Sequence, residues 1–242
     1  LNSSQHSIKL AYEYRHKEHH IETGAIFRHE AVNEHSREWE FRDSSGYSMP
    51  HNPESLEVIY NLKSDNAISS NHMEMYAQDT WRRESSKGIF SLNYGMRFSY
   101  WSWNKEWLLS PRASLTFIPK NHDNMTFRLA TGLYYQRPFY KELKDTITNG
   151  ATTIVQLNQD IQSQRSFQVI AGYEYRFKIG KRPFLFATEL YYKAQDRLNP
   201  YTVDNTKIVY YGRNCATGNV LGADFKLYGE FVPGTDSWLT FS

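Results

Sequence analysis

The sequence predicts an all-β protein, an antiparallel up-and-down transmembrane β-barrel to which this chain contributes about ten strands. Three observations support this prediction. Apolar and polar residues alternate over long stretches, and the links between these stretches alternate in length. Aromatic residues make up 16% of the 242 residues, although the mean hydropathy is only −0.68. A chain this polar overall and this aromatic locally must separate its apolar and polar side chains over very short distances.

The segment 90–100 shows the alternation most clearly. Its polar or small residues occupy every second position, from Ser91 to Ser99, and the positions between them are apolar or aromatic: Phe90, Leu92, Tyr94, Met96, Phe98 and Tyr100. Successive side chains of a strand point to opposite faces, so the segment has one apolar and one polar face. A helix would scatter these six residues around its circumference. The segment is therefore predicted to be a strand.

The same alternation recurs along the chain and predicts further strands. They lie around residues 8–15, 21–31, 73–81, 113–117, 125–136, 167–177, 184–192 and 221–231, and a last strand begins near Trp238. A soluble antiparallel sandwich or barrel would also alternate in this way. Several stretches are, however, longer than the roughly 5–6 residues usual in soluble sheets. They suit tilted membrane strands, which need about 9–11 residues.

The predicted links take turns between short and long. Short links fall at 17–19, 84–87, 119–124, 179–183 and 232–237, and long links at 33–71, 101–110, 137–165 and 196–217. Outer-membrane barrels have tight turns at one rim and long loops at the other, whereas Greek-key sandwiches have no reason for this regularity. Aromatic residues gather beside the long links and predict an interfacial girdle: Tyr100, Trp101, Trp103, Trp107, Tyr134, Tyr135, Tyr191, Tyr192, Tyr210 and Tyr211.

Charge and cysteine content argue against several classes of protein. The formal net charge is +2, which does not indicate a nucleic-acid partner. The lone Cys215 excludes an internal disulfide framework and cysteine-rich zinc patterns. No apolar run approaches the roughly 18 residues of a membrane-spanning helix. The opening residues lack the basic and apolar regions of a signal peptide, so an export signal is expected to be removed or to lie upstream.

Several segments resemble, in their order and spacing, the barrel of TonB-dependent receptors. MYAQDTWR at 75–82 is followed by LNYGMRFSYW at 92–101 and then by SPRASLTFIPKNHDNMTFRLATGLYYQRPFYKEL at 110–143. GNVLGADFKLYGEF at 218–231 resembles a further strand of the family. The resemblance covers about 70–231. It implies that residues 1–242 are an internal part of a barrel of about 22 strands, without the plug domain, the TonB box or the closing strands.

The resemblance also implies a function and partners. The family imports scarce nutrients such as iron chelates, cobalamin or glycans across the outer membrane of Gram-negative bacteria. The ligand binds extracellular loops and plug, and the inner-membrane energy complex then acts through TonB on the plug. The expected partners are therefore outer-membrane lipid, the protein's own plug domain, TonB and a small ligand, with no cofactor and no enzymatic activity.

Candidate site residues follow from position and side-chain chemistry. Gln136, Arg137 and Tyr140 stand where a strand gives way to a long link, and the Arg fork suits carboxylate or phosphate. Trp101, Trp103 and Trp107 offer flat faces to a ligand, although a girdle role competes. Other candidates fall on inward positions, where charges need water or protein partners, and are expected to face the plug: Tyr76, Gln78, Arg97, Arg128, Glu174 and Arg176.

Two other functional classes remain open at this stage. One is a self-contained ten-stranded outer-membrane protease or lipase, for which the long link 33–71 supplies carboxylates and histidines such as Glu34, His35 and Asp43. The other is a structural or adhesive barrel. No catalytic constellation stands out. His16, His19 and His20 cluster in a predicted turn, but solvated turn histidines are common and no metal site is assigned.

Overall fold

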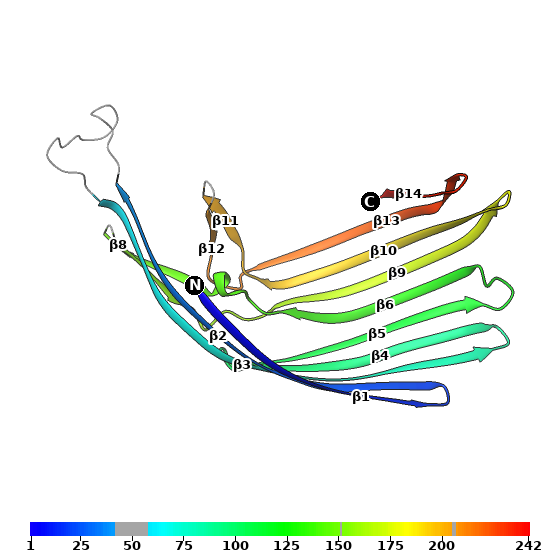
Figure 1. Ribbon diagram of the computed structural model, residues 1–242, viewed down its shortest axis with the longest axis horizontal. Helices are drawn as coiled ribbons and strands as arrows, with labels where there is room; N and C mark the ends of the chain where they lie inside the picture. Colours follow the sequence, from blue (N-terminus) through cyan, green and yellow to red (C-terminus); the bar gives the residue numbers. More distant parts are fainter. Residues whose placement is uncertain (42–57, 151, 205–206) are drawn as a thin grey trace.

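The computed structural model describes residues 1–41, 58–150, 152–204 and 207–242 and consists mainly of long strands (Figure 1). Ten of them form an antiparallel meander in which each strand pairs with the next one. These are β1 (Asn2–His16), β2 (His19–Phe41), β3 (Val58–Ser85), β4 (Gly88–Trp101), β5 (Glu106–Pro119), β6 (Met125–Gln136), β9 (Gln164–Ile179), β10 (Arg182–Leu198), β13 (Ala216–Val232) and β14 (Thr235–Phe241). All ten strands predicted from the alternation are confirmed.

The sheet is strongly curved, and β1 and β14 form its two edges in this chain (Figure 1). The turns β1–β2, β3–β4, β5–β6, β9–β10 and β13–β14 all lie at one end, where the short links were predicted. At the β3–β4 turn, Gly88 has a φ of 146°. A Cβ there would lie 2.2 Å from the carbonyl oxygen of Ile118, so the turn requires glycine.

One face of the sheet is apolar and exposed, and we call it the apolar face. Leu10 is 69% exposed, Met75 59% and Leu129 51%. Such residues would be buried in a soluble sandwich, whereas a barrel in a membrane presents them to lipid. The other face, here the polar face, carries the charged residues that alternate with them. No helix in the described part of the chain is long and apolar enough to cross a membrane.

The prediction of a long link at 33–71 is wrong over most of its length. β2 continues to Phe41 and β3 begins at Val58, and the two pair in register from Asn33 with Ala67 to Trp39 with Asn61. The sequence did not reveal this extension of β2 and β3, because most of its side chains are polar and its apolar residues do not recur at every second position. Backbone pairing and charged contacts hold it instead, such as Arg37 with Asp65 at 3.0 Å. Asp43 lies outside the described residues.

The predicted long link at 101–110 is also wrong. β4 ends at Trp101 and β5 begins at Glu106, so only residues 102–105 separate the strands. Tyr100 and Trp107 are partners across the ladder, with ring centroids 4.2 Å apart. The tryptophan-rich sequence suggested a loop, but these aromatic residues belong to the ends of the paired strands. The strict turn-taking of short and long links therefore fails at this point.

The two remaining long links contain structure of their own. The first holds η1 (Tyr140–Leu143), β7 (Lys144–Asn149) and β8 (Thr152–Leu157), and β8 pairs in parallel with β3 at residues 61–64. The second holds the β11 (Tyr201–Asp204) and β12 (Lys207–Tyr210) hairpin. Figure 1 shows both at the end of the sheet opposite the short turns.

The prediction of an aromatic girdle is wrong for several of its residues and stays a prediction for those on the apolar face. Trp107 and Tyr192 lie on the apolar face and are 62% and 41% exposed. Trp101, in contrast, is buried, and Tyr134 lies beneath the Arg112 guanidinium, 4.4 Å from its ring centroid. Tyr191 covers Gly222 on the polar face. The aromatic residues do gather near the ends of the strands, as expected. Whether a ring lies on the apolar or the polar face depends on its position in the alternation of that strand.

Candidate functional site

A cavity of about 400 Å³ opens on the polar face near the end that carries the long links. Strands β2 to β5 form its wall, and the segment that follows β6 covers one side. Its lining is both aromatic and charged and includes Glu30, Ser70, His72, Glu74, Arg97, Trp101, Ser110, Arg112, Tyr135, Arg137, Phe139 and Tyr140. Ligand sites are typically concave and combine aromatic rings with polar groups, and this cavity carries more charged groups than an ordinary apolar pocket.

Strand register brings the wall residues together. His72 pairs with Arg28 on one side and with Trp101 on the other, so the three side chains share the polar face. His72 and Trp101 stack with ring centroids 5.5 Å apart, and both are almost completely buried. The Nε2 atom of His72 lies 3.5 Å from Oε2 of Glu30. A rigid sheet thus positions these groups without a loop.

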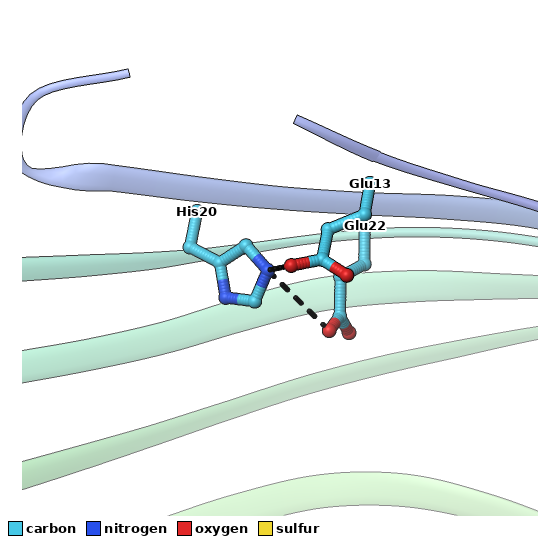
Figure 2. A group of neighbouring side chains, drawn as sticks. All are labelled: Glu13, His20 and Glu22. Atoms are coloured by element: carbon cyan, nitrogen blue, oxygen red, sulfur yellow. Dashed lines mark hydrogen bonds and ion pairs between the residues drawn. The ribbon is translucent and has the colours of Figure 1, made fainter. Parts of the chain in front are cut away.

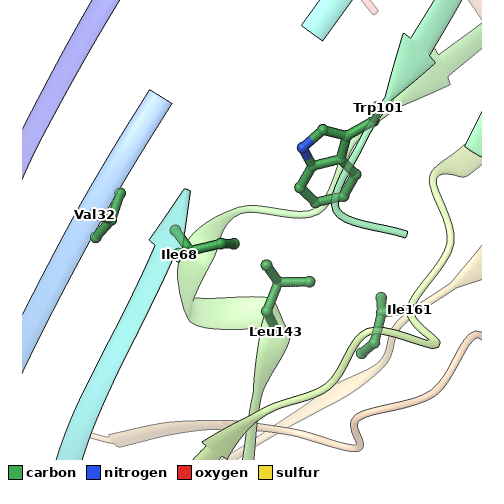
Figure 3. Packing of buried hydrophobic residues seen from close by; sticks show 5 residues of the cluster. All are labelled: Val32, Ile68, Trp101, Leu143 and Ile161. Atoms are coloured by element: carbon green, nitrogen blue, oxygen red, sulfur yellow. The ribbon is translucent and has the colours of Figure 1, made fainter. Parts of the chain in front are cut away.

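An apolar cluster fastens the link between β6 and β9 to the sheet. Figure 3 shows Leu143 of η1 in the middle of the cluster, between Ile68 on one side and Trp101 and Ile161 on the other, with Val32 beyond Ile68. Leu143 and Ile161 are each only 1% exposed. Burying such side chains contributes about 1.5–3 kcal/mol each. The link is therefore held against the wall and forms part of the cavity.

Glu34 of β2 provides a second attachment for the same link. Its carboxylate accepts hydrogen bonds from the Tyr140 hydroxyl at 3.0 Å, from the Ser64 hydroxyl at 2.8 Å and from the Lys144 ammonium. Burial and the nearby Glu34 raise the pKa of Tyr140, which therefore stays protonated and donates. Within η1, the Phe139 backbone N–H donates to Glu142 Oε2 at 3.1 Å. These contacts fix the position of the residues that border the cavity.

Buried polar atoms without a partner lie in the cavity wall and on residues close to it. Burial, and then the neighbouring Arg28 cation, lower the pKa of Arg137, while Glu30 acts in the opposite direction. Among the described residues, several buried polar atoms lack a hydrogen-bond partner, including Arg28 Nε, Trp101 Nε1, Trp103 Nε1 and His72 Nδ1. Three of these four atoms are donors only. Unsatisfied buried donors are costly. Trp101 lines the cavity, so a ligand carrying acceptor oxygens would satisfy its indole N–H, whereas Arg28 and Trp103 are not part of the lining.

The structure brings together some of the predicted ligand-binding residues. Arg137 and Tyr140 line the cavity, and Trp103 packs against the apolar cluster beside it. Gln136 is exposed at the end of β6 and is not part of the lining. Trp107 lies on the apolar face, stacked on Phe98 with ring centroids 5.1 Å apart. The cavity and Trp107 are thus on opposite faces of the sheet.

Sequence reasoning missed Arg28, His72 and Arg112, whereas Trp101 was expected beside a ligand or in the girdle. The alternation could have placed each of them on the polar face, because their neighbours at i±1 are apolar or face lipid. Only the strand register shows that Arg28, His72 and Trp101 are neighbours, and Arg112 joins His72 and Trp101 in the lining of the cavity. Glu34 was considered as a loop carboxylate, whereas the structure places it on β2, holding the link over the cavity.

The residues predicted to face a plug all lie on the polar face. Tyr76 packs over Gly24 and under the Arg97 guanidinium, which lies 5.9 Å from its ring centroid. Gln78 donates to Glu22. Farther along the sheet, Glu174 accepts from Arg128 at 2.9 Å and lies 3.6 Å from Arg176.

The turn histidines do not form one metal site. His19 contacts Asp79 through Nδ1 at 2.6 Å, while His20 contacts Glu13 through Nε2 at 2.8 Å. His16 stacks on Tyr14. Because His19 and His20 are adjacent on a strand, their side chains point to opposite faces of the sheet.

The fold is shared with solved outer-membrane proteins. The siderophore receptor PirA from Pseudomonas aeruginosa aligns with 13% identity and a TM-score of 0.62, covering 98% of this chain and 42% of its own. The outer-membrane transporter YddB from Escherichia coli aligns with 14% identity and a TM-score of 0.62, covering 94% of this chain and 30% of its own. The copper transporter OprC aligns with 13% identity and a TM-score of 0.62, covering 99% of this chain and 36% of its own. The chain thus spans about a third of the length of these proteins. No curated protein matches the sequence significantly.

The sequence itself matches one family model over nearly its whole length. The model describes a TonB-dependent receptor-like β-barrel, and the match runs from residue 2 to residue 242. It agrees with the curved antiparallel sheet, the exposed apolar face and the short turns gathered at one end. The members of this family are transporters, so the protease or lipase alternative is set aside. The chain belongs to the TonB-dependent receptor β-barrel family.

Proposed function

We propose that this chain forms part of the wall of an outer-membrane transporter that imports a scarce small nutrient, and that the cavity receives an anionic part of that nutrient. The observation that carries the proposal is the set of three arginines that line the cavity, Arg97, Arg112 and Arg137, which outnumber its two carboxylates, Glu30 and Glu74. The buried Nε1 atom of Trp101, another lining residue, has no hydrogen-bond partner. Arginine forks suit carboxylate and phosphate oxygens, and the Trp101 and Tyr140 rings offer apolar contact. An anionic iron chelate has both properties.

Membership of the family supports the rest of the proposed transport cycle. The polar face becomes the lumen, and a plug domain contacts the residues around Tyr76, Gln78, Arg97, Arg128, Glu174 and Arg176. Energy from the inner membrane reaches the plug through TonB. Several of these lumenal charges pair with each other, as Arg128 does with Glu174 at 2.9 Å. They can therefore face a polar plug without leaving a charge unpaired.

Ligand binding tests the proposal. The intact protein in detergent micelles is titrated with a ferric tris-catecholate, with an uncharged ferric trihydroxamate and with a maltodextrin, and tryptophan fluorescence is followed. We expect the anionic chelate to bind most tightly and Arg137→Gln to weaken it about tenfold or more, as expected for a charge-assisted hydrogen bond worth about 1.5–3 kcal/mol. The control is Lys141→Gln, an exposed residue of the same link that does not line the cavity. Equal binding of all three probes, or an unaffected Arg137→Gln variant, would contradict the proposal.

A further inference from the structure

Three metal-ligating side chains meet on the polar face, nearer the short turns than the cavity described above. Glu13 comes from β1, and His20 and Glu22 come from β2 (Figure 2). His20 Nε2 lies 2.8 Å from Glu13 Oε1 and 3.7 Å from Glu22 Oε1. One ligand atom from each residue lies within 4.8 Å of the other two. Figure 2 shows the imidazole edge turned toward both carboxylates.

The position of the two carboxylates is electrostatically unusual. Glu13 and Glu22 are direct partners across the β1–β2 ladder. Like charges directly opposite each other destabilise a sheet. A different neighbour stabilises the charge of each carboxylate. The Arg15 guanidinium lies 2.6 Å from Glu13 Oε1, and the Gln78 amide donates a hydrogen bond to Glu22. With neutral His20, the four ionisable groups Glu13, Glu22, Arg15 and His20 still sum to one negative charge.

A small cavity of about 280 Å³ opens beside the carboxylates. It is lined by Ala11, Tyr12, Glu13, Glu22 and Tyr76. Side chains of Glu13, Glu22 and His20 are 52%, 37% and 29% exposed, so a hydrated ion can reach them. The three groups stand on two directly paired strands, which hold their spacing better than a loop would.

We infer that Glu13, His20 and Glu22 bind a divalent first-row transition-metal ion. One imidazole nitrogen and two carboxylate oxygens form a donor set that suits Zn²⁺ and its neighbours, whereas Mg²⁺ prefers oxygen ligands alone. Three protein ligands leave at least one coordination position for water. Binding requires the proton between His20 Nε2 and Glu13 to leave and the Arg15 guanidinium to move away from Glu13. Gln78 then remains as the group that orients Glu22.

This site is independent of the proposed nutrient cavity. The two lie on the same face but share no lining residue. Failure of anionic-chelate binding therefore leaves the metal site untouched, and the reverse also holds.

Calorimetry tests the site directly. The intact protein, purified in detergent micelles and stripped with a chelator, is titrated with Zn²⁺ and separately with Mg²⁺. We expect one Zn²⁺ per chain, no Mg²⁺ heat, and loss of at least tenfold in Zn²⁺ affinity in both His20→Ala and Glu22→Gln. Arg15→Gln should bind Zn²⁺ more tightly than the natural protein, because it removes the competing cation. His122→Ala, an exposed histidine of the β5–β6 turn, is the matched control and should bind normally.

A second measurement separates ligation from folding. Co²⁺ bound at the site should give a visible absorption spectrum that His20→Ala loses while its thermal unfolding stays unchanged. Glu22→Gln keeps the shape and hydrogen-bonding capacity of the side chain, so it covers the case in which His20→Ala does not fold. Zn²⁺ affinity that is unaffected by His20→Ala and Glu22→Gln, or no Zn²⁺ binding at all, would overturn the inference.

Discussion

His72 of β3 and Trp101 of β4 are direct partners across the ladder, and their rings stack with centroids 5.5 Å apart. This pair joins the two parts of the candidate site. His72 belongs to the polar wall of the cavity, and Trp101 belongs to the apolar cluster that holds Leu143 and Ile161. A change in the pair should therefore affect both the wall and the link that covers it.

Replacing Trp101 should loosen this link. Trp101 is 5% exposed, and Trp→Ala in a packed core costs about 3–5 kcal/mol. We expect Trp101→Ala to increase proteolytic cleavage within residues 137–163 and to lower the unfolding temperature. Trp107→Ala is the matched control, because Trp107 is 62% exposed on the apolar face. If the two variants are cleaved equally, Trp101 does not hold the link.

Glu34 should control the same link through polar contacts. Glu34→Gln weakens the charge-assisted bonds from Lys144 and Tyr140. We expect faster amide hydrogen exchange over residues 140–149, with the rest of β2 unchanged. Asp65→Asn removes a charged group of the neighbouring exposed pairs with His35 and Arg37, and it should have little effect because exposed ion pairs contribute about 0–1 kcal/mol. The same exchange rates in Glu34→Gln and the natural protein would argue against this role.

Glu142 should make the stability of η1 depend on pH. Burial raises its pKa above the ordinary value of 4.5, so the folded link binds the proton more tightly than the unfolded link does. Its stabilising contribution is therefore present below pH 4.5 and is lost as the pH rises through the folded pKa. Glu142→Gln stays neutral and can still accept from the Phe139 N–H.

Hydrogen exchange at different pH values measures this effect. After correction for the intrinsic rate, protection of residues 139–146 should fall with rising pH in the natural protein and stay level in Glu142→Gln. A parallel decline in both proteins would show that another group is responsible.

Gly24 should be required for the position of Tyr76. A Cβ at residue 24 would lie 2.5 Å from Tyr76 Cε1, so the ring must move and leave its place beside Arg97. Overpacking of this kind costs about 1–3 kcal/mol. We expect Gly24→Ala to lower the unfolding temperature. Gly172→Ala, whose Cβ would meet its nearest neighbour at 3.6 Å, should be tolerated. Equal unfolding temperatures for the two variants would contradict the steric argument.

Local alternation made the fold predictable. From Phe90 to Tyr100, a period of two assigns every side chain to a face, and this depends only on the geometry of an extended chain. The same rule located all ten strands of the meander and the short turns between them. It could not find the distal parts of β2 and β3, because residues 33–41 and 58–71 are held by backbone pairing beyond the apolar stretch.

The candidate site was predictable only in part. Arg137 and Tyr140 were found because a strand visibly ends there and because their side chains suit a ligand. Arg28 and His72 were missed, although the alternation assigns both to the polar face. Residues 28 and 72 become neighbours of each other and of Trp101 only through the strand register. The same is true of Glu13, His20 and Glu22, where one of the three residues lies on another strand.

The sequence by itself thus determined the strands, their two faces and the class of protein, since these depend on local periodicity and on the order of short segments. The tertiary structure alone decided which tryptophan is buried, where the link after β6 lies and which charges meet. Those outcomes depend on contacts between residues far apart in the chain, such as Tyr140 with Glu34, and on the phase at which each strand enters the sheet. Local periodicity excludes a one-residue change of register, which would move every side chain of a strand to the other face. It does not exclude a change by two residues, which keeps each face but changes which side chains meet.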